Sequence, residues 1–262
     1  MTPPASPSPD PDDPDPAPGA DPAPGPQRGA DPAPDAAAGV GVGQAWVVRA
    51  RAEQRRLAAR VRLGPSRSLP PAVVGVDVSY GIDDDVAVAV AVALDTATFA
   101  VVDQSTAVGA PEVPYVPGLL SFRELPLVLA ALRDLDTSPQ LIVVDGHGYA
   151  HPARFGLACH LGVELGVATI GCAKTPFVGT FDEPGPERGA WADIVVEDGE
   201  VVGSALRTRI GVKPVFVSPG HLIDGSSARA IVLALSPRYR LPETTRQADQ
   251  LSRRALAALT DD

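Results

Sequence analysis

The residues that first point to chemistry lie in the stretch LIVVDGHGYAHP, residues 141–152. Four apolar residues of strand type lead into Asp145, and the glycine-rich turn that follows carries His147 and His151. A buried strand that ends on a carboxylate can hold a charged group rigidly at the edge of a core. Asp145 then binds a metal or does acid/base work, or it is a turn aspartate that caps the next helix. The stretch alone favours neither reading.

Three further acidic residues stand in positions that could carry chemistry. Asp77 lies inside the apolar, β-branched run VVGVDVSYG, where an unpaired carboxylate would cost several kcal/mol, although backbone hydrogen bonds could satisfy it. Glu124 follows Ser121 at the spacing of a capping box, which is a purely structural explanation for it. Asp249 is surrounded by three arginines on a predicted helix, so an ion pair on the helix face would explain it equally well.

Basic and aromatic residues add three candidates for contact with nucleic acid. Tyr115 sits among three prolines in PEVPYVPG, a stiff loop that either packs back onto the body or presents a wedge to stacked bases. Lys174 ends an apolar run and could be an ordinary surface lysine. The predicted helix over 44–62 has six arginines against the single Glu53, a pattern of a solvated face or of a surface that contacts phosphates.

The predicted elements place these residues on an α/β scaffold. Three strands with short connections predict an antiparallel meander, and the later strand–helix–strand spacing predicts two parallel strands. The Asp198-Gly199 pair predicts a hairpin. The expected strands are 73–81, 86–94, 99–107, 141–144, 167–174, 193–197, 200–206 and 214–217. The expected helices are 44–62, 125–135 with a cap at 121, 151–165, 226–235 and one from Pro242 to 259. A turn is expected at 218–224.

Composition divides the chain of 262 residues into two parts. Residues 1–40 are rich in Pro, Asp and Ala and cannot bury enough apolar surface to fold, so we expect a disordered acidic tail before a folded domain over 41–262. Residues 1–38 contribute −6 of the formal charge of −10, which leaves −4 on the body. A mildly acidic body argues against binding to nucleic acid mainly through bulk charge, but it allows a local basic groove.

Several classes of protein are disfavoured by the sequence. Cys159 and Cys172 form no metal-binding spacing, and we expect both to be reduced and buried. No apolar run reaches the roughly 20 residues that span a bilayer, so we expect a soluble cytoplasmic protein without a membrane partner. His147, His151, His160 and His221 form no close ligand pair, and His160 is expected to pack in a core. The sequence offers no Walker loop and no nucleophile elbow.

Taken in order, six motifs resemble those of the endonuclease V family, the deoxyinosine-directed endonucleases. They are VVGVDVSY, PYVPGLLSFRE, VDGHGYAHP, LGVATIGCAK, GHLID and YRLPETTRQAD, and together they cover residues 73–249. The order of strands, helices and acids is also that of RNase H-like nucleases. The resemblance implies an α/β RNase H-like fold, in which a mixed central sheet of three antiparallel strands followed by parallel strands is flanked by helices.

The resemblance also implies roles for individual residues. Asp77 and Asp145 match the two metal-binding aspartates, and Mg²⁺ is the implied ion, with Mn²⁺ as a substitute. The implied catalytic positions are Asp77, Glu124, Asp145, Lys174 and Asp249. The implied substrate-binding positions are the wedge at Tyr115 with Val116, and a lesion pocket of Gly118, Leu120, Gly146 and His151. Two residues depart from the family pattern, Thr175 where a second basic residue is common and Tyr149 where a smaller residue is usual.

The implied activity is Mg²⁺-dependent hydrolysis of the second phosphodiester bond 3′ to deoxyinosine, leaving 3′-hydroxyl and 5′-phosphate ends. We expect a monomer that binds DNA carrying deoxyinosine or other deaminated bases. The main alternative is an endoribonuclease specific for inosine in single-stranded RNA, because a 2′-hydroxyl is read by local geometry that the sequence does not reveal. A binding protein that has lost catalysis and a generic structure-specific nuclease are further alternatives.

Overall fold

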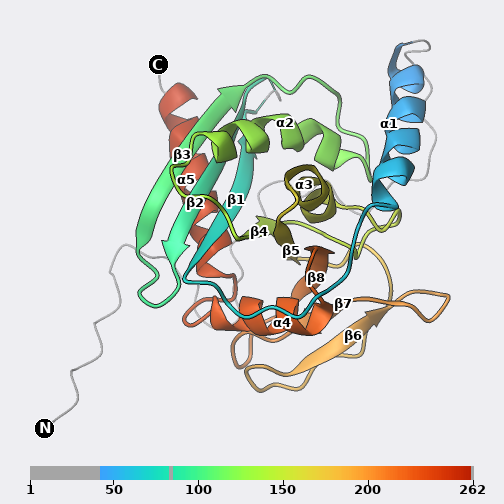
Figure 1. Ribbon diagram of the computed structural model, residues 1–262, viewed down its shortest axis with the longest axis vertical. Helices are drawn as coiled ribbons and strands as arrows, with labels where there is room; N and C mark the ends of the chain where they lie inside the picture. Colours follow the sequence, from blue (N-terminus) through green and yellow to red (C-terminus); the bar gives the residue numbers. More distant parts are fainter. Residues whose placement is uncertain (1–41, 83–84, 261–262) are drawn as a thin grey trace, which may run out of the picture. The chain divides into compact units, whose positions relative to one another are not determined.

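A mixed sheet of eight strands forms the centre of the computed structural model, which describes residues 42–82 and 85–260 (Figure 1). The strands lie in the order β3-β2-β1-β4-β5-β8-β7-β6. They are β1 Ala72–Tyr80, β2 Ala87–Asp95, β3 Val101–Gly109, β4 Leu141–Asp145, β5 Ala168–Ala173, β6 Trp191–Val195, β7 Val201–Leu206 and β8 Val215–His221. The helices are α1 Val42–Ala58, α2 Leu120–Arg133, α3 Leu157–Leu165, α4 Gly225–Ala234 and α5 Glu243–Thr260.

The pairing of the strands confirms the predicted mixed sheet. Strands β1, β2 and β3 form the antiparallel meander, and β4 pairs in parallel with both β1 and β5. The hairpin predicted around Asp198-Gly199 is formed by β6 and β7. It joins the sheet through β8, which runs antiparallel to β5 and β7.

Helices cover both faces of the sheet because successive side chains of a strand point to opposite faces. In β2, Ala89, Ala91 and Ala93 pack with α2 residues, whereas Val88 and Val90 pack with Ala248 of α5. Helix α3 joins α2 in the first cluster, and α4 packs with residues of β1, β4, β5, β7 and β8 on the other face. Helix α1 lies outside α3 (Figure 1), as expected from its apolar face.

The predicted start of α3 is wrong. The helix begins at Leu157, six residues after His151, and Pro152 lies in the preceding turn. That turn is held to β8 by a hydrogen bond from the Tyr149 amide to the Pro219 carbonyl, and it is closed by one from the Gly156 amide to the Gly148 carbonyl. Long-range bonds therefore override a local sequence that favours a helix.

Two other local predictions are also wrong. Helix α2 starts at Leu120 without a side-chain cap, so Ser121 lies inside the first turn and its hydroxyl pairs with Nδ1 of His160 at 3.1 Å. The predicted turn over 218–224 is instead strand as far as His221. The strand continues past Pro219 because a register shift in the β5–β8 pairing accommodates it.

The remaining predictions concern the buried cysteines and His160, the N-terminal tail and membrane-spanning helices. Cys159 and Cys172 are buried and unbridged, and His160 is packed between two phenylalanine rings, as predicted. The predicted disordered tail lies outside the described residues. Within residues 42–82 and 85–260, no helix has the length and apolar character needed to cross a membrane.

Burial of His160 should make the fold less stable in acid. Its side chain is only 4% exposed, and burial lowers its pKa to about 4 from the ordinary value of 6.5. The histidine therefore stabilises the fold fully above about pH 6.5 and loses this contribution as the pH falls towards 4. Between pH 7.5 and 5 the wild type should lose about 2 kcal/mol more unfolding free energy than His160→Gln. Urea unfolding at both pH values measures this, and equal losses would contradict it.

Candidate active site

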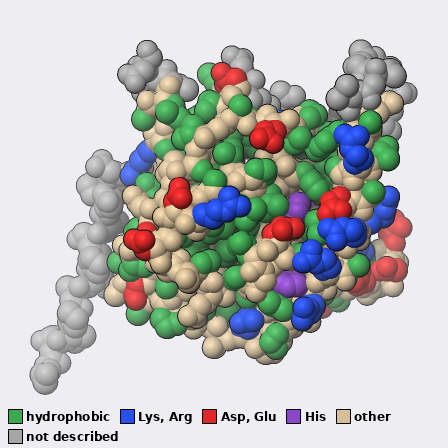
Figure 2. Space-filling view, turned by 45° about the horizontal axis from the view of Figure 1, so that its top comes forward, with side chains coloured by type: hydrophobic (Ala, Val, Ile, Leu, Met, Phe, Trp, Pro, Cys, Tyr) green, Lys and Arg blue, Asp and Glu red, His purple; other side chains and the backbone are tan. Residues whose placement is uncertain are grey.

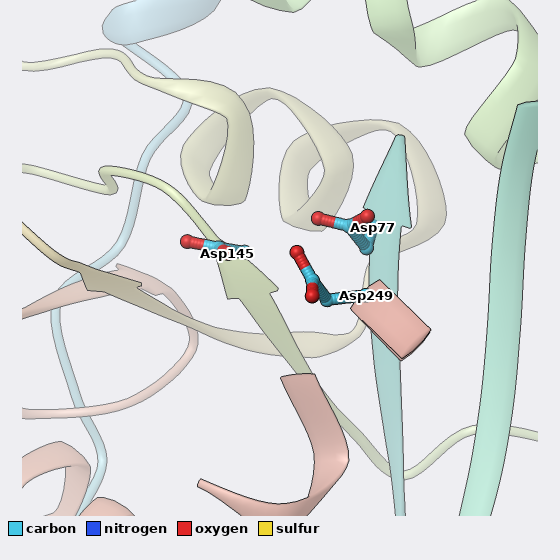
Figure 3. A group of neighbouring side chains, drawn as sticks. All are labelled: Asp77, Asp145 and Asp249. Carbon is cyan, nitrogen blue, oxygen red and sulfur yellow. The ribbon is translucent and has the colours of Figure 1, made fainter. Parts of the chain in front are cut away.

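Three aspartates meet above the centre of the sheet (Figure 3). Asp77 comes from the middle of β1, Asp145 is the last residue of β4, and Asp249 lies on α5. One carboxylate oxygen from each lies within 4.8 Å of the other two. Figure 3 shows the three side chains converging from two strands and one helix. The structure thus brings together three of the acidic residues that the sequence singled out.

The parallel pairing of β1 and β4 sets the distance between the first two aspartates. Val76 is paired with Val144, and Asp77 and Asp145 each follow one residue later. Both carboxylates therefore leave neighbouring strands at the same level and on the same face. The C-terminal ends of buried strands hold such groups rigidly.

A glycine in β1 lets α5 approach closely enough to add the third carboxylate. A Cβ at Gly75 would collide with the backbone carbonyl of Thr244 in the first turn of α5. Because no side chain intervenes, α5 lies directly on β1 and β2, and Asp249 reaches the other two aspartates. The sequence VVGVD thus contains both the first carboxylate and the glycine that makes space for the helix carrying the third.

Lys174 partly compensates the negative charge of the cluster. It follows β5, and its Nζ lies 2.8 Å from Oδ2 of Asp145 and 3.8 Å from Oδ1 of Asp249. Burial alone would lower the pKa of Lys174, but the neighbouring carboxylates outweigh burial and raise it. Arg253 pairs with Asp249 from the solvent side at 3.0 Å.

Ser252 holds the carboxylate of Asp77, and Ser79 contacts Ser252. Oγ of Ser252, three residues after Asp249 on α5, donates to Oδ2 of Asp77 at 2.6 Å. Oγ of Ser79 lies 2.8 Å from the same hydroxyl. Burial and the charge of Asp145 raise the pKa of Asp77 to about 6, while the Ser252 hydrogen bond opposes that rise. The serine therefore favours the charged form of the aspartate.

Glu124 lies near this cluster but is not one of its three converging groups. It is 8% exposed on α2, and its Oε1 accepts a hydrogen bond from the Tyr80 hydroxyl at 3.2 Å. Burial and the charges of Asp77 and Asp145 raise its pKa to about 8. The capping explanation does not apply, because Ser121 is not a cap. Glu124 thus lies in the opposite layer of helices, where the charges of Asp77 and Asp145 still raise its pKa.

The predicted substrate-binding residues lie on the loop before α2 and the turn after β4. Tyr115 is 51% exposed, and Leu120 is 37% exposed. Gly118 has a φ of 77° and sits beside His151, because a Cβ there would lie 3.8 Å from the imidazole ring. Val116 and Gly146 are half-buried. His151 is 6% exposed, and burial lowers its pKa to about 4, so it is neutral at pH 7.

Phe177 joins this group although the sequence gave no signal for it. Its ring is 40% exposed and lies 5.2 Å from the ring of His151 and 5.6 Å from that of His147. Among the described residues, the buried Nδ1 of His147 has no hydrogen-bond partner. His151, which adjoins Gly118, thus lies against an exposed aromatic ring that also contacts His147.

Other contributors could have been recognised only in part. Ser252 is one helical turn after Asp249, and Ser79 is two residues after Asp77, so helix and strand periodicity put each on the appropriate face. Tyr80 gave no such signal. Tyr149, a departure from the family pattern, donates its hydroxyl to Oε1 of Glu200 at 2.7 Å and so braces the β6–β7 hairpin. The larger side chain of Tyr149 is thus accommodated by a contact with the β6–β7 hairpin.

The donor set of the three aspartates suits a hard divalent cation. All the converging atoms are carboxylate oxygens, which are the ligands that Mg²⁺ and Mn²⁺ prefer. The two buried cysteines lie outside the group, and no histidine belongs to it. A cation at this position would also offset the charge of Asp145, which together with burial raises the pKa of Asp77.

Comparisons with known proteins give the same result. The family model for endonuclease V matches residues 55–250. An endonuclease V of Streptomyces avermitilis is 56% identical over 217 residues, which are 80% of this chain and 93% of that protein. The crystal structure of an endonuclease V from the same organism superposes with a TM-score of 0.78 at 55% identity, covering 81% of this chain and 94% of that one.

A more distant structure includes nucleic acid. Endonuclease V of Ciona intestinalis, in complex with a 24mer DNA that contains an inosine followed by a ribo-adenosine, has a TM-score of 0.72 and 28% identity. The match covers 82% of this chain and 99% of that one. The fold and its acidic centre define a nuclease of the RNase H-like class. The chain belongs to the endonuclease V family.

Loss of the Ser252 hydroxyl should weaken cation binding. Ser252→Ala removes the hydrogen bond that orients Asp77 and favours its charged form, so affinity for Mg²⁺ or Mn²⁺ should fall about tenfold. Calorimetric titration measures this. Ser226→Ala is the matched control, because it removes an equally short hydrogen bond, Oγ to Oδ1 of Asp224 at 2.6 Å, on the distant helix α4. Unchanged affinity in Ser252→Ala would contradict the role assigned to this serine.

Proposed function

We propose that the protein cleaves DNA at deoxyinosine by hydrolysing the second phosphodiester bond 3′ to the lesion, leaving 3′-hydroxyl and 5′-phosphate ends. The convergence of Asp77, Asp145 and Asp249 next to Lys174 is the observation that carries the proposal. Membership of the endonuclease V family supports a nuclease, and the inosine-containing complex of the Ciona relative supports inosine as the feature recognised.

Asp77 and Asp145 would hold Mg²⁺, with Mn²⁺ as a substitute, and Asp249 and Glu124 complete the catalytic positions. When bound, the cation supplies positive charge that activates water and stabilises charge on the phosphodiester. Lys174 binds a phosphate oxygen from the side of Asp145, since its ammonium group already lies at the rim of the cluster. Ser252 keeps Asp77 oriented throughout.

Recognition of the base would fall to the loop and turn that meet at Gly118. Tyr115, supported by Val116 and exposed at the tip of the loop, separates the strands, and the flipped hypoxanthine enters a pocket formed by Gly118, Leu120, Gly146 and His151. The neutral His151 binds a polar edge of the base without carrying charge. Unstacking costs least at a mispaired base, which favours lesions over intact pairs.

The proposal extends to the oligomeric state, the location, the domain bounds and further substrates of the enzyme. We infer a monomeric cytoplasmic protein whose catalytic domain spans 41–262 and whose substrates include DNA with other deaminated bases. Cleavage of inosine in single-stranded RNA is the second candidate function. Because the DNA in the Ciona complex carries a ribo-adenosine after the inosine, cleavage of RNA should be tested directly.

A nicking assay tests the proposed reaction. Matched oligonucleotides carry one inosine in duplex DNA, one inosine in single-stranded RNA, or none, with Mg²⁺ and the cut mapped to the nucleotide. The wild type should cut the inosine DNA at the second bond. Asp145→Asn should lose about 1,000-fold in rate, because the cation contributes several kcal/mol to the transition state. Asp182→Asn, an exposed loop aspartate, should cleave normally.

Two outcomes of this assay would contradict the proposal. Cleavage confined to the RNA would establish the second candidate instead. Equal cutting of DNA with and without inosine would identify a nuclease that does not read the base.

The wedge assigned to Tyr115 predicts a dependence on strand pairing. Tyr115→Ala should slow cleavage of duplex inosine DNA by about tenfold, because a stacking ring contributes about 1–3 kcal/mol. Inosine in a single strand needs no strand separation and should be affected much less, which makes it the internal control. Single-turnover rates on both substrates measure the difference. Equal slowing on both would show that Tyr115 is not a wedge.

A further inference from the structure

Helix α1 carries arginines on two exposed flanks, and the flanks differ in their ion pairs. Its buried face is formed by Ala50, Gln54 and Leu57. At 100° per residue, Arg51 and Arg55 lie together on one side of this face, and Arg49, Glu53 and Arg56 lie on the other. We call Arg51 and Arg55 the arginine flank.

Only part of the charge on the opposite flank is offset, because Glu53 pairs with one of its two arginines. Glu53 binds Arg56 through two contacts, Nε to Oε2 at 2.7 Å and Nη2 to Oε1 at 2.6 Å. The arginine flank has no such partner. Both of its side chains are exposed, and within residues 42–82 and 85–260 neither forms an ion pair or a hydrogen bond through its guanidinium.

The two guanidinium groups thus form a local positive patch on a body of negative net charge. Figure 2 shows Lys and Arg side chains gathered on the right-hand part of the molecule, the side on which Figure 1 places α1. Such a patch attracts an anion, and the planar fork of arginine fits the oxygens of a phosphodiester.

The arginine flank adjoins the residues assigned to base recognition. Gln54, on the buried face next to the arginine flank, donates from Nε2 to the Gly118 carbonyl at 2.8 Å and to the Phe155 carbonyl at 3.3 Å. Gly118 in turn lies beside His151. Burial is the main cause of the low pKa of His151, and the positive charge of Arg51 contributes to it. Helix α1 is therefore anchored at the place where the loop of Tyr115 meets the turn after β4.

We propose that Arg51 and Arg55 bind backbone phosphates of the nucleic-acid strand that carries the lesion, where that strand leaves the base pocket and passes over α1. The inference deepens the proposed function and rests on it, because the position of the pocket determines where the strand runs. Continuity with Gly118 and His151, together with the unpaired charge, favours nucleic acid over another anion. These contacts position the strand and carry no sequence information.

Salt dependence of binding tests the proposal in the full-length protein. Each phosphate contact contributes about 0.9 to the slope of log affinity against log salt for duplex DNA. Arg51→Gln/Arg55→Gln should therefore flatten the slope by about 1.8 and weaken binding about tenfold at moderate salt. Fluorescence anisotropy with a chelator present, so that no cleavage occurs, measures both quantities on inosine duplex and on unmodified duplex.

The matched control is Arg49→Gln/Arg56→Gln. It removes the same formal charge from the same helix, and glutamine has nearly the helix propensity of arginine, so both variants should fold. The control should keep the wild-type slope. Circular dichroism and thermal unfolding verify that the two variants are equally folded.

Two results would overturn the proposal. A wild-type slope in Arg51→Gln/Arg55→Gln would show that these arginines do not bind phosphates. An equal loss in both variants would reduce the effect to net charge. A failure of the proposed function is seen separately, as a wild type that does not nick inosine DNA, because the slope is measured without cleavage.

Discussion

Asp77, Asp145 and Asp249 repel one another, and the strands and helix that carry them hold them together against that repulsion. Two unit charges about 4 Å apart repel by about 4 kcal/mol at an effective dielectric constant of 20, so three gathered carboxylates are stable only if their charge is offset. The chain supplies part of the offset through Lys174 and the hydroxyl of Ser252. The remaining excess of negative charge is what makes the place suitable for a divalent cation.

The sheet and its two helix layers can be understood as the means of holding this repulsive group together. Parallel pairing of β1 with β4 fixes two carboxylates, and Gly75 allows α5 to bring the third. On the other layer, α2 carries Glu124 towards the cluster, and the loop ahead of α2 presents Tyr115. Helix α1 is tied to that loop through Gln54. The proposed roles in chemistry, base recognition and strand positioning thus fall on adjacent parts of one scaffold.

The sequence predicted those parts whose cause is local. Three apolar runs with short connections revealed the meander, Asp198-Gly199 revealed the hairpin, and Asp77 was conspicuous because a carboxylate in an apolar strand needs a partner. The errors have non-local causes. The start of α3 depends on a bond from Tyr149 to Pro219, and β8 continues past that proline because β5 pairs with it. Phe177 came near the two histidines only through tertiary packing, which no spacing reveals.

The proposed cation, held by Asp77 and Asp145 next to Asp249, can be located directly. Crystals of the protein soaked in Mn²⁺ should show an anomalous scattering peak between the carboxylates of Asp77, Asp145 and Asp249, and the peak should be lost in Asp145→Asn. A peak elsewhere, or no peak at a Mn²⁺ concentration that sustains cleavage in solution, would contradict a cation site at these aspartates.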